Sequence, residues 1–374
     1  MRILVLISNM SGGGAERVAA LLCNQWSRAG HSVVLTPTFL GPKESVYPLD
    51  PAVEVLHLVD RAGSGWRRGR LGRLVSLRTL VQDVAPDVVV SFLYNVNVSV
   101  LMATIGMKVP VVVAECSYPP NEPTPSMLGR LRRWAYPRAS RTVMQTERGL
   151  QWLRSEIPAA RGTVLINGIE LPIPASPPAV NPDTVVRQGA KLLLGVGRLD
   201  ALKNFALLIE SFARLADRHP QWTLAILGSG VERENLERQV ETLGMSGRIH
   251  IVGRAGNLHD WYARADAFAT TSLLEGFPNS LLEALCYGLP AAALDCPTGP
   301  AELIRDGVNG VLLPLNSDAG HYAAGLERVL EPDMPQLEVE RDALRAKCAI
   351  ETVARQWVAL FESVQTGAVR GPQG

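Results

Sequence analysis

Short apolar runs alternate with amphipathic stretches along most of this chain of 374 residues. The runs at 3–7, 88–92 and 291–294 are almost wholly apolar, as strands buried on both faces of a parallel sheet are. The stretches between such runs, notably 71–84 and 204–218, place apolar residues at helical spacing. Strands that alternate with helices in this way predict an α/β fold in which helices cover both faces of parallel sheets.

The predicted strands fall into two groups on either side of a proline-rich stretch. They are expected at 3–7, 33–36, 53–57, 88–92, 111–115, 142–145 and 163–166, and then at 191–196, 223–227, 249–252, 267–270, 291–294 and 310–313. Five prolines between residues 171 and 183 indicate a linker, and the chain is too long for one ordinary core. We therefore predict two Rossmann-like domains that face each other across a cleft. Their limits are 1–172 and 187–350, with a linker at 173–186 and a C-terminal helix and tail at 351–374 that can cross back to the first domain.

Composition places the chain among folded globular proteins, since 47% of its residues are apolar and 20% are charged. Its five cysteines are scattered and never form a CxxC pair, which argues against a disulfide framework or a zinc site and indicates a reducing compartment. There is no DxD pair and no histidine spacing typical of metal ligands, so we expect no metal or other cofactor. No apolar run approaches the ~18–20 residues of a spanning helix. These features predict a cytoplasmic protein.

Charge is distributed unevenly between the two halves of the chain. Residues 1–178 contain 19 Lys and Arg against 12 Asp and Glu, whereas residues 179–374 contain 18 against 24. The basic half carries two clusters: Arg61, Arg67, Arg68, Arg70 and Arg73, and then Arg130, Arg132, Arg133, Arg138 and Arg141, the second interleaved with Met127, Leu128, Leu131, Trp134 and Tyr136. We favour attachment to an anionic membrane surface or capture of a phosphorylated acceptor. A solvated basic helix and a nucleic-acid patch are the alternatives.

One stretch of the second half combines several features of a ligand site. The expected strand 267–270 leads into a turn that contains Glu275 and Gly276. A helix is predicted to begin at Pro278, because proline suits the first helical position, and to end at Gly288. A carboxylate therefore lies in front of a helix N-terminus.

The start of this helix is a candidate anion site, because free N–H groups around Asn279 and Ser280 combine with the helix dipole. Glu283 follows among apolar neighbours, where an unpaired carboxylate is costly. A ligand with hydroxyl groups at both ends and a diphosphate between them would match this arrangement, and sugar nucleotides have that shape. The alternatives are a solvated loop acid at Glu275 and an ordinary helix-surface residue at Glu283.

Glycines also follow the first strand of each predicted domain. The three glycines at 12–14 lack the GxGxxG spacing, so a dinucleotide site is weakly indicated, and we favour close approach to an anion over a simple tight turn. In the second domain Gly197 and Arg198 precede Lys203, which predicts a cationic rim suited to phosphate oxygens. Gly253 and Arg254 form another glycine turn at the end of a strand.

Taken together, these motifs resemble the retaining GT-B glycosyltransferases of family four. The resemblance rests on Gly13-Gly14-Ala-Glu16-Arg17, on Gly197-Arg198 with Lys203-Asn204, and on Glu275 and Glu283 eight residues apart with Gly-Phe-Pro between them. The motifs occur in the family's order and spacing and cover both predicted domains.

The resemblance implies roles for individual residues. Arg198 and Lys203 would hold the donor diphosphate, Glu275 would contact hydroxyls of the donor sugar, and these three residues are the candidate catalytic groups. The other donor-binding residues implied are Gly13, Gly14, Gly197, Gly253, Arg254, Gly276, Phe277, Pro278, Asn279, Ser280 and Glu283, the last of them at the ribose. The acceptor-binding residues implied are Glu16, Arg17, Glu115, Arg132 and Arg133.

The sequence departs from the family at one position. Many members carry a histidine after the strand that corresponds to 111–115, whereas this chain has Glu115-Cys116-Ser117. We interpret Cys116 as a packing residue, since nothing nearby marks a paired base. Which group assists at the reacting centre stays open.

The resemblance implies metal-independent transfer of a sugar from a nucleotide diphosphate with retention, in which fixed cations stabilise the leaving group. The donor would be UDP-N-acetylhexosamine or a UDP-hexose, and the acceptor a polyprenyl-diphosphate-linked glycan of a cell-surface polysaccharide or glycoprotein, at the inner face of the cell membrane. The alternatives are a sugar-nucleotide epimerase of the same fold and a non-catalytic protein that binds a sugar nucleotide.

Overall fold

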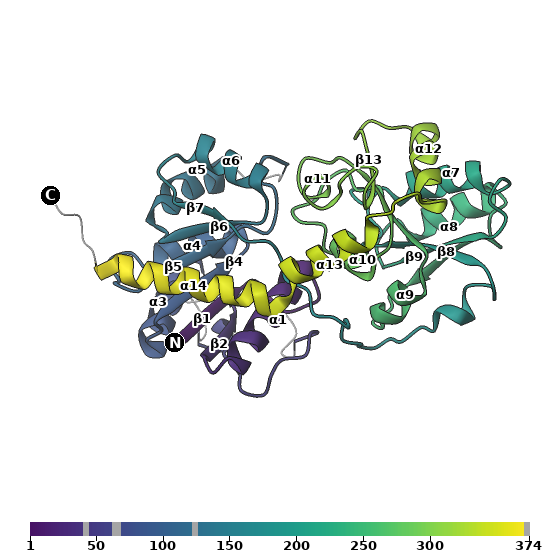
Figure 1. Cartoon of the computed structure of the whole chain (residues 1–374). Coiled ribbons are helices and arrows are strands. Elements are labelled where there is room, and N and C mark those ends of the chain that lie inside the picture. The colour runs from purple at the N-terminus through teal and green to yellow at the C-terminus, as the bar shows by residue number, and fades with distance from the viewer. Residues whose placement is uncertain (40–44, 62–68, 122–125, 370–374) are drawn as a thin grey trace. The chain divides into compact units, whose positions relative to one another are not determined.

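The computed structural model describes residues 1–39, 45–61, 69–121 and 126–369. The chain forms two compact units. Unit 1 consists of residues 1–168 together with 348–374, and unit 2 consists of residues 169–347. Each unit contains a sheet with helices packed around it (Figure 1).

Unit 1 is built on a seven-stranded sheet with the order β3-β2-β1-β4-β5-β6-β7, in which neighbouring strands are parallel. The strands are β1 (Arg2–Ile7), β2 (Ser32–Pro37), β3 (Glu54–Val55), β4 (Val88–Phe92), β5 (Val111–Ala114), β6 (Arg141–Met144) and β7 (Gly162–Val164). The helices are α1 (Gly14–Arg28), α2 (Leu58–Arg61), α3 (Arg70–Val84), α4 (Tyr94–Ala103), α5 (Ser126–Ala135), α6 (Glu147–Glu156) and α14 (Ile350–Val369), with short 3-10 helices η2 (Pro119–Asn121) and η3 (Tyr136–Arg138).

The side chains of β1 alternate between the two faces of this sheet and contribute to two cores. Ile3, Val5 and Ile7 belong to the core shared with α1 and α14. Leu4 and Leu6 belong to the core shared with α3 and α4. Because both faces are covered, every residue from 3 to 7 is buried, which explains the unbroken apolar run in the sequence.

The C-terminal helix α14 is part of unit 1. Trp26 of α1 contacts Trp357 and Phe361 edge to face, with ring centroids 6.2 and 5.3 Å apart. The indole N–H of Trp26 also donates to the Ala354 carbonyl at 3.3 Å. The last helix therefore returns to the first domain, and Figure 1 shows it running past α1 and β1.

Unit 2 is built on a six-stranded parallel sheet with the order β10-β9-β8-β11-β12-β13. The strands are β8 (Lys191–Val196), β9 (Trp222–Leu227), β10 (Ile249–Gly253), β11 (Ala267–Thr270), β12 (Ala291–Leu294) and β13 (Gly310–Leu313). The helices are α7 (Phe205–Leu215), α8 (Arg233–Thr242), α9 (Leu258–Arg264), α10 (Asn279–Tyr287), α11 (Pro300–Leu303), α12 (Ala319–Leu330) and α13 (Leu337–Cys348), with the 3-10 helix η4 (Pro182–Thr184).

The proline-rich segment 173–186 lies along unit 2. The N–H of Ser176 donates to the Gly256 carbonyl at 3.0 Å, and the indole N–H of Trp261 donates to the Val180 carbonyl at 3.0 Å. Asn257 binds both the N–H and the carbonyl of Val180. Backbone and side-chain hydrogen bonds thus hold this segment against the loop before α9 and against α9 itself.

The predicted fold class is confirmed, since both units are α/β with parallel sheets. Five strands, at 88–92, 191–196, 267–270, 291–294 and 310–313, have the predicted limits. The strand expected at 53–57 is only the two exposed residues of β3, which lies at the edge of the sheet and bonds to one neighbour alone.

Candidate functional site

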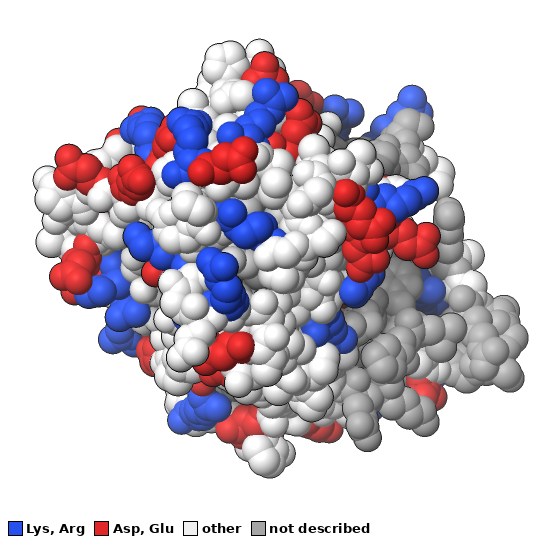
Figure 2. Space-filling view, turned by 90° about the vertical axis from the view of Figure 1, so that its right-hand side faces the viewer, with Lys and Arg blue, Asp and Glu red and all other residues white. Residues whose placement is uncertain are grey.

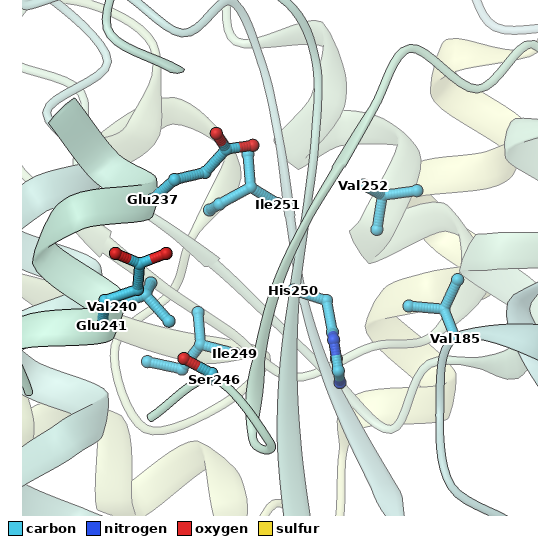
Figure 3. Close-up of a pocket in the computed structure, with 9 residues that line it drawn as sticks. All are labelled: Val185, Glu237, Val240, Glu241, Ser246, Ile249, His250, Ile251 and Val252. Atoms are coloured by element: carbon cyan, nitrogen blue, oxygen red, sulfur yellow. The ribbon is translucent and has the colours of Figure 1, made fainter. Parts of the chain in front are cut away.

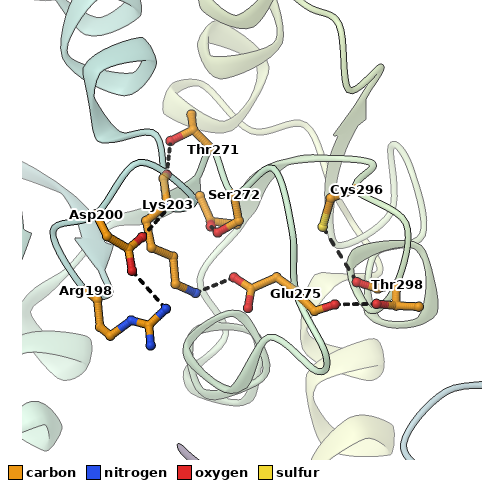
Figure 4. Close-up of polar contacts among 9 residues, drawn as sticks. Arg198, Asp200, Lys203, Thr271, Ser272, Glu275, Cys296 and Thr298 are labelled. Atoms are coloured by element: carbon orange, nitrogen blue, oxygen red, sulfur yellow. Dashed lines mark hydrogen bonds and ion pairs between the residues drawn. The ribbon is translucent and has the colours of Figure 1, made fainter. Parts of the chain in front are cut away.

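The loops that follow β8 and β11 meet at the carboxyl edge of the unit 2 sheet, because the strands run parallel and lie side by side. The first loop carries Lys203 and the second carries Glu275. The Lys203 ammonium donates to Oε1 of Glu275, and the two side chains are only 17% and 10% exposed. Two residues that the sequence predicted for one site are therefore in direct contact (Figure 4).

The backbone around Lys203 is fixed by neighbouring side chains. Its N–H donates to Oδ1 of Asp200 at 3.1 Å. The Thr271 hydroxyl donates to the carbonyls of Lys203 at 3.0 Å and of Asn204 at 2.8 Å. Asn204 has a φ of +49°, the left-handed conformation that a sharp entry into α7 requires here. The lysine therefore has a defined position before any ligand arrives.

Arg198 belongs to the same loop but extends into solvent. Its guanidinium pairs with Oδ2 of Asp200 at 2.8 Å, and its side chain is 72% exposed. A chain of contacts consequently runs from Arg198 through Asp200 and Lys203 to Glu275 (Figure 4). The predicted cationic rim is present, and each of its two cations is paired with a carboxylate.

The turn that carries Glu275 is held by the loop after β12. The Thr298 hydroxyl donates to the Glu275 carbonyl. Gly299 has a φ of +101°, and a methyl group there would lie 2.2 Å from Cδ of Pro278. Burial raises the pKa of the nearby Cys296 thiol to about 12, with the Glu275 charge as a second cause, so this thiol stays protonated. Thr298 was not among the predicted site residues, although its place after a predicted strand is a signal that could have indicated it.

The helix α10 begins one residue later than expected. Pro278 is the residue before the helix rather than its first residue. The N–H of Asn279 donates to the Phe277 carbonyl at 3.0 Å, so the expectation that this N–H is free for an anion is wrong. Glu283 is 4% exposed, as its apolar neighbours predict. Gly288 ends the helix with a φ of +84°.

Glycine turns at neighbouring strand ends pack directly on the Arg198 loop. A methyl group at Gly228 would lie 1.7 Å from the Gly197 carbonyl oxygen, so only glycine fits that approach. The Gly228 N–H donates to the Gly253 carbonyl at 2.8 Å. Arg254 follows on the surface. The loops after β8, β9 and β10 therefore form one continuous rim.

The glycine loop of unit 1 leads into α1 from the carboxyl end of β1. Gly13 is the N-terminal cap of the helix, and a methyl group there would lie 2.1 Å from Oε2 of Glu16. The Glu16 carboxylate, 8% exposed, thus lies over the loop where an anion was expected. Gly14 and Arg17 fall in the first turn of the helix, with the Arg17 N–H donating to the Gly13 carbonyl at 3.1 Å.

Glu115 and Arg132 form a buried polar cluster at the carboxyl end of β5. Arg132 Nη1 lies 3.5 Å from Oε1 of Glu115, and the two residues are 6% and 1% exposed. The Tyr136 hydroxyl donates to the same carboxylate, and burial together with the Glu115 charge raises the pKa of Tyr136 well above its usual value. Arg132 is therefore an interior residue, and counting it with the surface cations was wrong. Arg133 is exposed and pairs with Glu156 at 2.8 Å.

The remaining basic residues of unit 1 differ in their surroundings. Arg67 and Arg68 lie outside the described residues. Arg61 pairs with Asp83 at 2.6 Å, and Arg73 lies over the Phe39 ring at 4.3 Å. On α5, Met127 and Trp134 are 57% and 45% exposed. Two exposed arginines adjoin them, Arg130 on the helix and Arg138 stacked on Trp134 at 3.7 Å.

Figure 2 shows how charged side chains are distributed on one face of the molecule. Basic and acidic side chains are interspersed there, and the visible blue groups do not merge into one basic area. Among the described residues, no helix has the length and apolar character needed to cross a bilayer. In the same part of the chain, no three His, Cys, Asp or Glu side chains gather as ligands for a metal ion.

The described residues enclose several cavities, and two of them bear on the site. One of about 320 Å³ follows the edge strand β10 and includes His250 and Val185, but none of the predicted site residues (Figure 3). The other, of about 450 Å³, lies in unit 1 at the ends of β1 and β2 and is lined by Met10, Pro37, Ser45, Tyr47, Pro48, Leu49, Val55 and His57. The Tyr47 hydroxyl donates to the Gly13 carbonyl at 3.1 Å, so this second cavity borders the glycine loop.

Two family models and several known proteins match this chain. Residues 180–345 match the family model described as glycosyl transferases group 1, and residues 13–168 match the glycosyl transferase 4-like domain. A relative from Campylobacter jejuni, named as a GalNAc-alpha-(1->4)-GalNAc-alpha-(1->3)-diNAcBac-PP-undecaprenol alpha-1,4-N-acetyl-D-galactosaminyltransferase, is 27% identical over 98% of this chain and 99% of its own. The amylovoran biosynthesis glycosyltransferase AmsD of Erwinia amylovora is 28% identical over 82% of this chain and 84% of its own.

Solved structures match over nearly the whole chain. Sucrose-phosphate synthase from Thermosynechococcus elongatus has a TM-score of 0.81 at 17% identity, covering 98% of this chain and all of that one. HepE of Anabaena in complex with UDP has a TM-score of 0.75 at 19% identity, covering 97% and 100%. These similarities show a shared fold, the GT-B architecture that the sequence predicts.

Proposed function

The chain belongs to the glycosyl transferases of group 1, and we propose that it moves a sugar from a UDP-activated donor to a polyprenyl-diphosphate-linked glycan with retention of configuration. The observation that carries the proposal is the contact between Lys203 and Glu275, with Arg198 on the same loop. Cations for a diphosphate and a carboxylate for sugar hydroxyls are thereby adjacent, as a sugar nucleotide requires. The complex of HepE with UDP supports uridine as the nucleoside of the donor for a chain of this fold.

In the proposed reaction, the bond between the anomeric carbon and the β-phosphate oxygen breaks, and its electron pair stays on the departing diphosphate. Arg198 and Lys203 stabilise this developing charge, which is the role a metal ion has in other transferases. The acceptor hydroxyl forms the new bond, and its proton passes to an oxygen of the departing diphosphate. Glu275 binds hydroxyls of the donor sugar and orients the anomeric carbon.

Glu283 and the rim glycines complete the proposed donor site. Glu283 is a buried carboxylate on α10, and in the proposal it accepts hydrogen bonds from the ribose. Gly253 and Arg254 lie beside the base, and the turn from Gly276 to Ser280 lies beside the phosphates. No metal takes part in this proposal, and chelation with EDTA tests that point by leaving the rate unchanged.

The acceptor is assigned to unit 1. The cavity of about 450 Å³ beside the Gly13 loop offers space at the carboxyl edge of that sheet, and Glu16 and Arg17 lie in the first turn of the helix that follows this loop. The Campylobacter relative is named for an undecaprenyl-diphosphate-linked acceptor, which supports the same class here.

Attachment to the inner membrane surface is proposed to occur through α5. Exposed Met127 and Trp134 can insert among acyl chains while Arg130, Arg133 and Arg138 meet anionic headgroups. Cosedimentation of the full chain with vesicles tests this, and equal binding to neutral and anionic vesicles would contradict it.

The decisive experiment is a donor screen in which nucleotide release is measured with and without a polyprenyl-diphosphate glycan. The proposal predicts release from a UDP-sugar only when the acceptor is present. Epimerisation of the donor without net release would identify the alternative epimerase activity. Absence of any turnover with tight donor binding would identify a non-catalytic binding protein.

A further inference from the structure

Asp200 contacts both residues that the proposed function places on the donor diphosphate. Its Oδ1 accepts the Lys203 N–H at 3.1 Å, and its Oδ2 lies 2.8 Å from Nη2 of Arg198. The aspartate side chain is 26% exposed, whereas that of Arg198 is 72% exposed. One oxygen therefore fixes the turn that presents Lys203, and the other binds a guanidinium that is largely exposed to solvent (Figure 4).

We propose that Asp200 is a positioning residue that competes with the donor diphosphate for the guanidinium of Arg198. The inference rests on the proposed function, because it takes Arg198 as a phosphate ligand. A guanidinium binds phosphate and carboxylate oxygens through the same planar set of N–H groups. A diphosphate that engages the edge of the guanidinium that includes Nη2 therefore competes with Asp200 for the same N–H groups.

The other cation of the proposed diphosphate site, Lys203, is also paired with a carboxylate. Lys203 is bound to Glu275, so the four side chains contain two positive and two negative charges. The site is thus less attractive to a diphosphate than two unpaired cations would be. In this arrangement Asp200 weakens the hold on the nucleotide, which favours departure of UDP after transfer.

The substitution Asp200→Asn distinguishes this competition from a purely structural role of Asp200. Asparagine keeps an oxygen that can accept the Lys203 N–H but removes the charge that holds Arg198. If Asp200 only caps the turn, the variant binds UDP no better than the parent. If it competes for Arg198, the variant binds UDP more tightly. Damage to a fold does not raise affinity, so a gain separates the two roles.

The test is calorimetric titration of the full chain with UDP, in the parent, Asp200→Asn, Arg198→Ala and the double variant. The proposal expects Asp200→Asn to lower the dissociation constant about two- to five-fold, the range of a partly exposed ion pair. The gain should shrink at high salt and should vanish in the Arg198→Ala background. The KM for the UDP-sugar should fall in parallel.

Asp306 provides a matched control in the same unit. It also accepts a backbone N–H, that of Leu312 at 3.0 Å, and also pairs with an arginine, Arg328 at 3.7 Å, but it precedes β13 at the amino edge of the sheet. Asp306→Asn should leave UDP affinity unchanged.

The results distinguish failure of the proposed competition by Asp200 from failure of the proposed phosphate binding by Arg198 and Lys203. If Arg198→Ala weakens UDP binding while Asp200→Asn leaves it unchanged or weaker, competition by Asp200 is overturned and the phosphate assignment stands. If neither Arg198→Ala nor Lys203→Ala changes UDP binding, the phosphate assignment itself fails.

Discussion

The carboxyl edges of the two sheets use charge in opposite ways. At unit 1 the charged pair of Glu115 and Arg132 is closed inside the domain and shares a hydrogen-bonded cluster with Tyr136. At unit 2 the Lys203–Glu275 pair connects two loops, the Arg198–Asp200 pair lies within one loop, and both pairs keep some exposure to solvent. Buried pairs of the first kind maintain a structure, whereas partly exposed pairs of the second kind can exchange a partner for a ligand. For these two sets of ion pairs, we therefore assign ligand binding to the pairs that the fold leaves partly accessible.

The largest effect is expected from Arg132→Met, on stability. Removing one partner of a buried pair leaves the Glu115 carboxylate without its cation, at a cost of about 3–5 kcal/mol in the free energy of unfolding. Urea unfolding measures the loss. Arg133→Met, on the same helix but exposed, should cost no more than about 1 kcal/mol. Equal losses in the two variants would contradict the difference drawn between interior and surface cations.

Lys203→Met is expected to affect turnover rather than folding. Loss of one fixed cation at a departing diphosphate should lower kcat about 10²–10³-fold, the range found for single electrostatic donors in other enzymes. Lys191→Met is the control. Lys191 is the first residue of β8, the strand that precedes the Lys203 loop, so it lies at the opposite, amino end of that strand, over the Trp222 ring. A similar fall in kcat for both variants would show that the loss is not specific to the donor edge.

Thr298→Val should produce an intermediate effect. The variant removes the hydrogen bond to the Glu275 carbonyl, worth about 0.5–1.5 kcal/mol, and loosens the turn that presents the carboxylate. We expect kcat to fall up to about ten-fold with little change in UDP affinity. Thr242→Val, at an exposed position on α8, controls for the substitution itself. Unchanged kcat would remove Thr298 from the supporting contacts of Glu275.

Arg130→Gln should have the smallest effect, on membrane binding. One basic residue near an anionic surface contributes about 1 kcal/mol, which corresponds to about five-fold in the partition coefficient at low salt. Arg214→Gln, exposed and paired with Glu210 in unit 2, is the control. Equal partitioning of the parent and Arg130→Gln would exclude α5 from the membrane surface.

The sequence predicted the buried strands well because strands covered on both faces leave continuous apolar runs. It did not predict α12, whose Gly320 and Gly325 weaken the helical pattern even though Tyr322 and Leu326 are fully buried. It also gave no signal for α13, which is largely exposed and rich in charge. Such helices depend on the sheet they cover rather than on their own composition.

Part of the candidate site could also be predicted from the sequence. Lys203 and Glu275 follow predicted strands, so their meeting at one sheet edge could be expected. The supporting roles of Asp200, Thr271 and Thr298 depend on contacts between loops distant in sequence, which no local pattern encodes. Arg132 was misassigned because a run of arginines looks uniformly solvated, whereas α5 turns one of them toward β5.

The most direct test of the central claim is acceptor-dependent release of UDP by the parent chain and by Glu275→Gln. Glu237→Gln, which removes an exposed carboxylate paired with Arg233, is the control. The account predicts release that requires the polyprenyl-diphosphate glycan, that survives in Glu237→Gln and that falls at least about 100-fold in Glu275→Gln. Undiminished release by Glu275→Gln would contradict it.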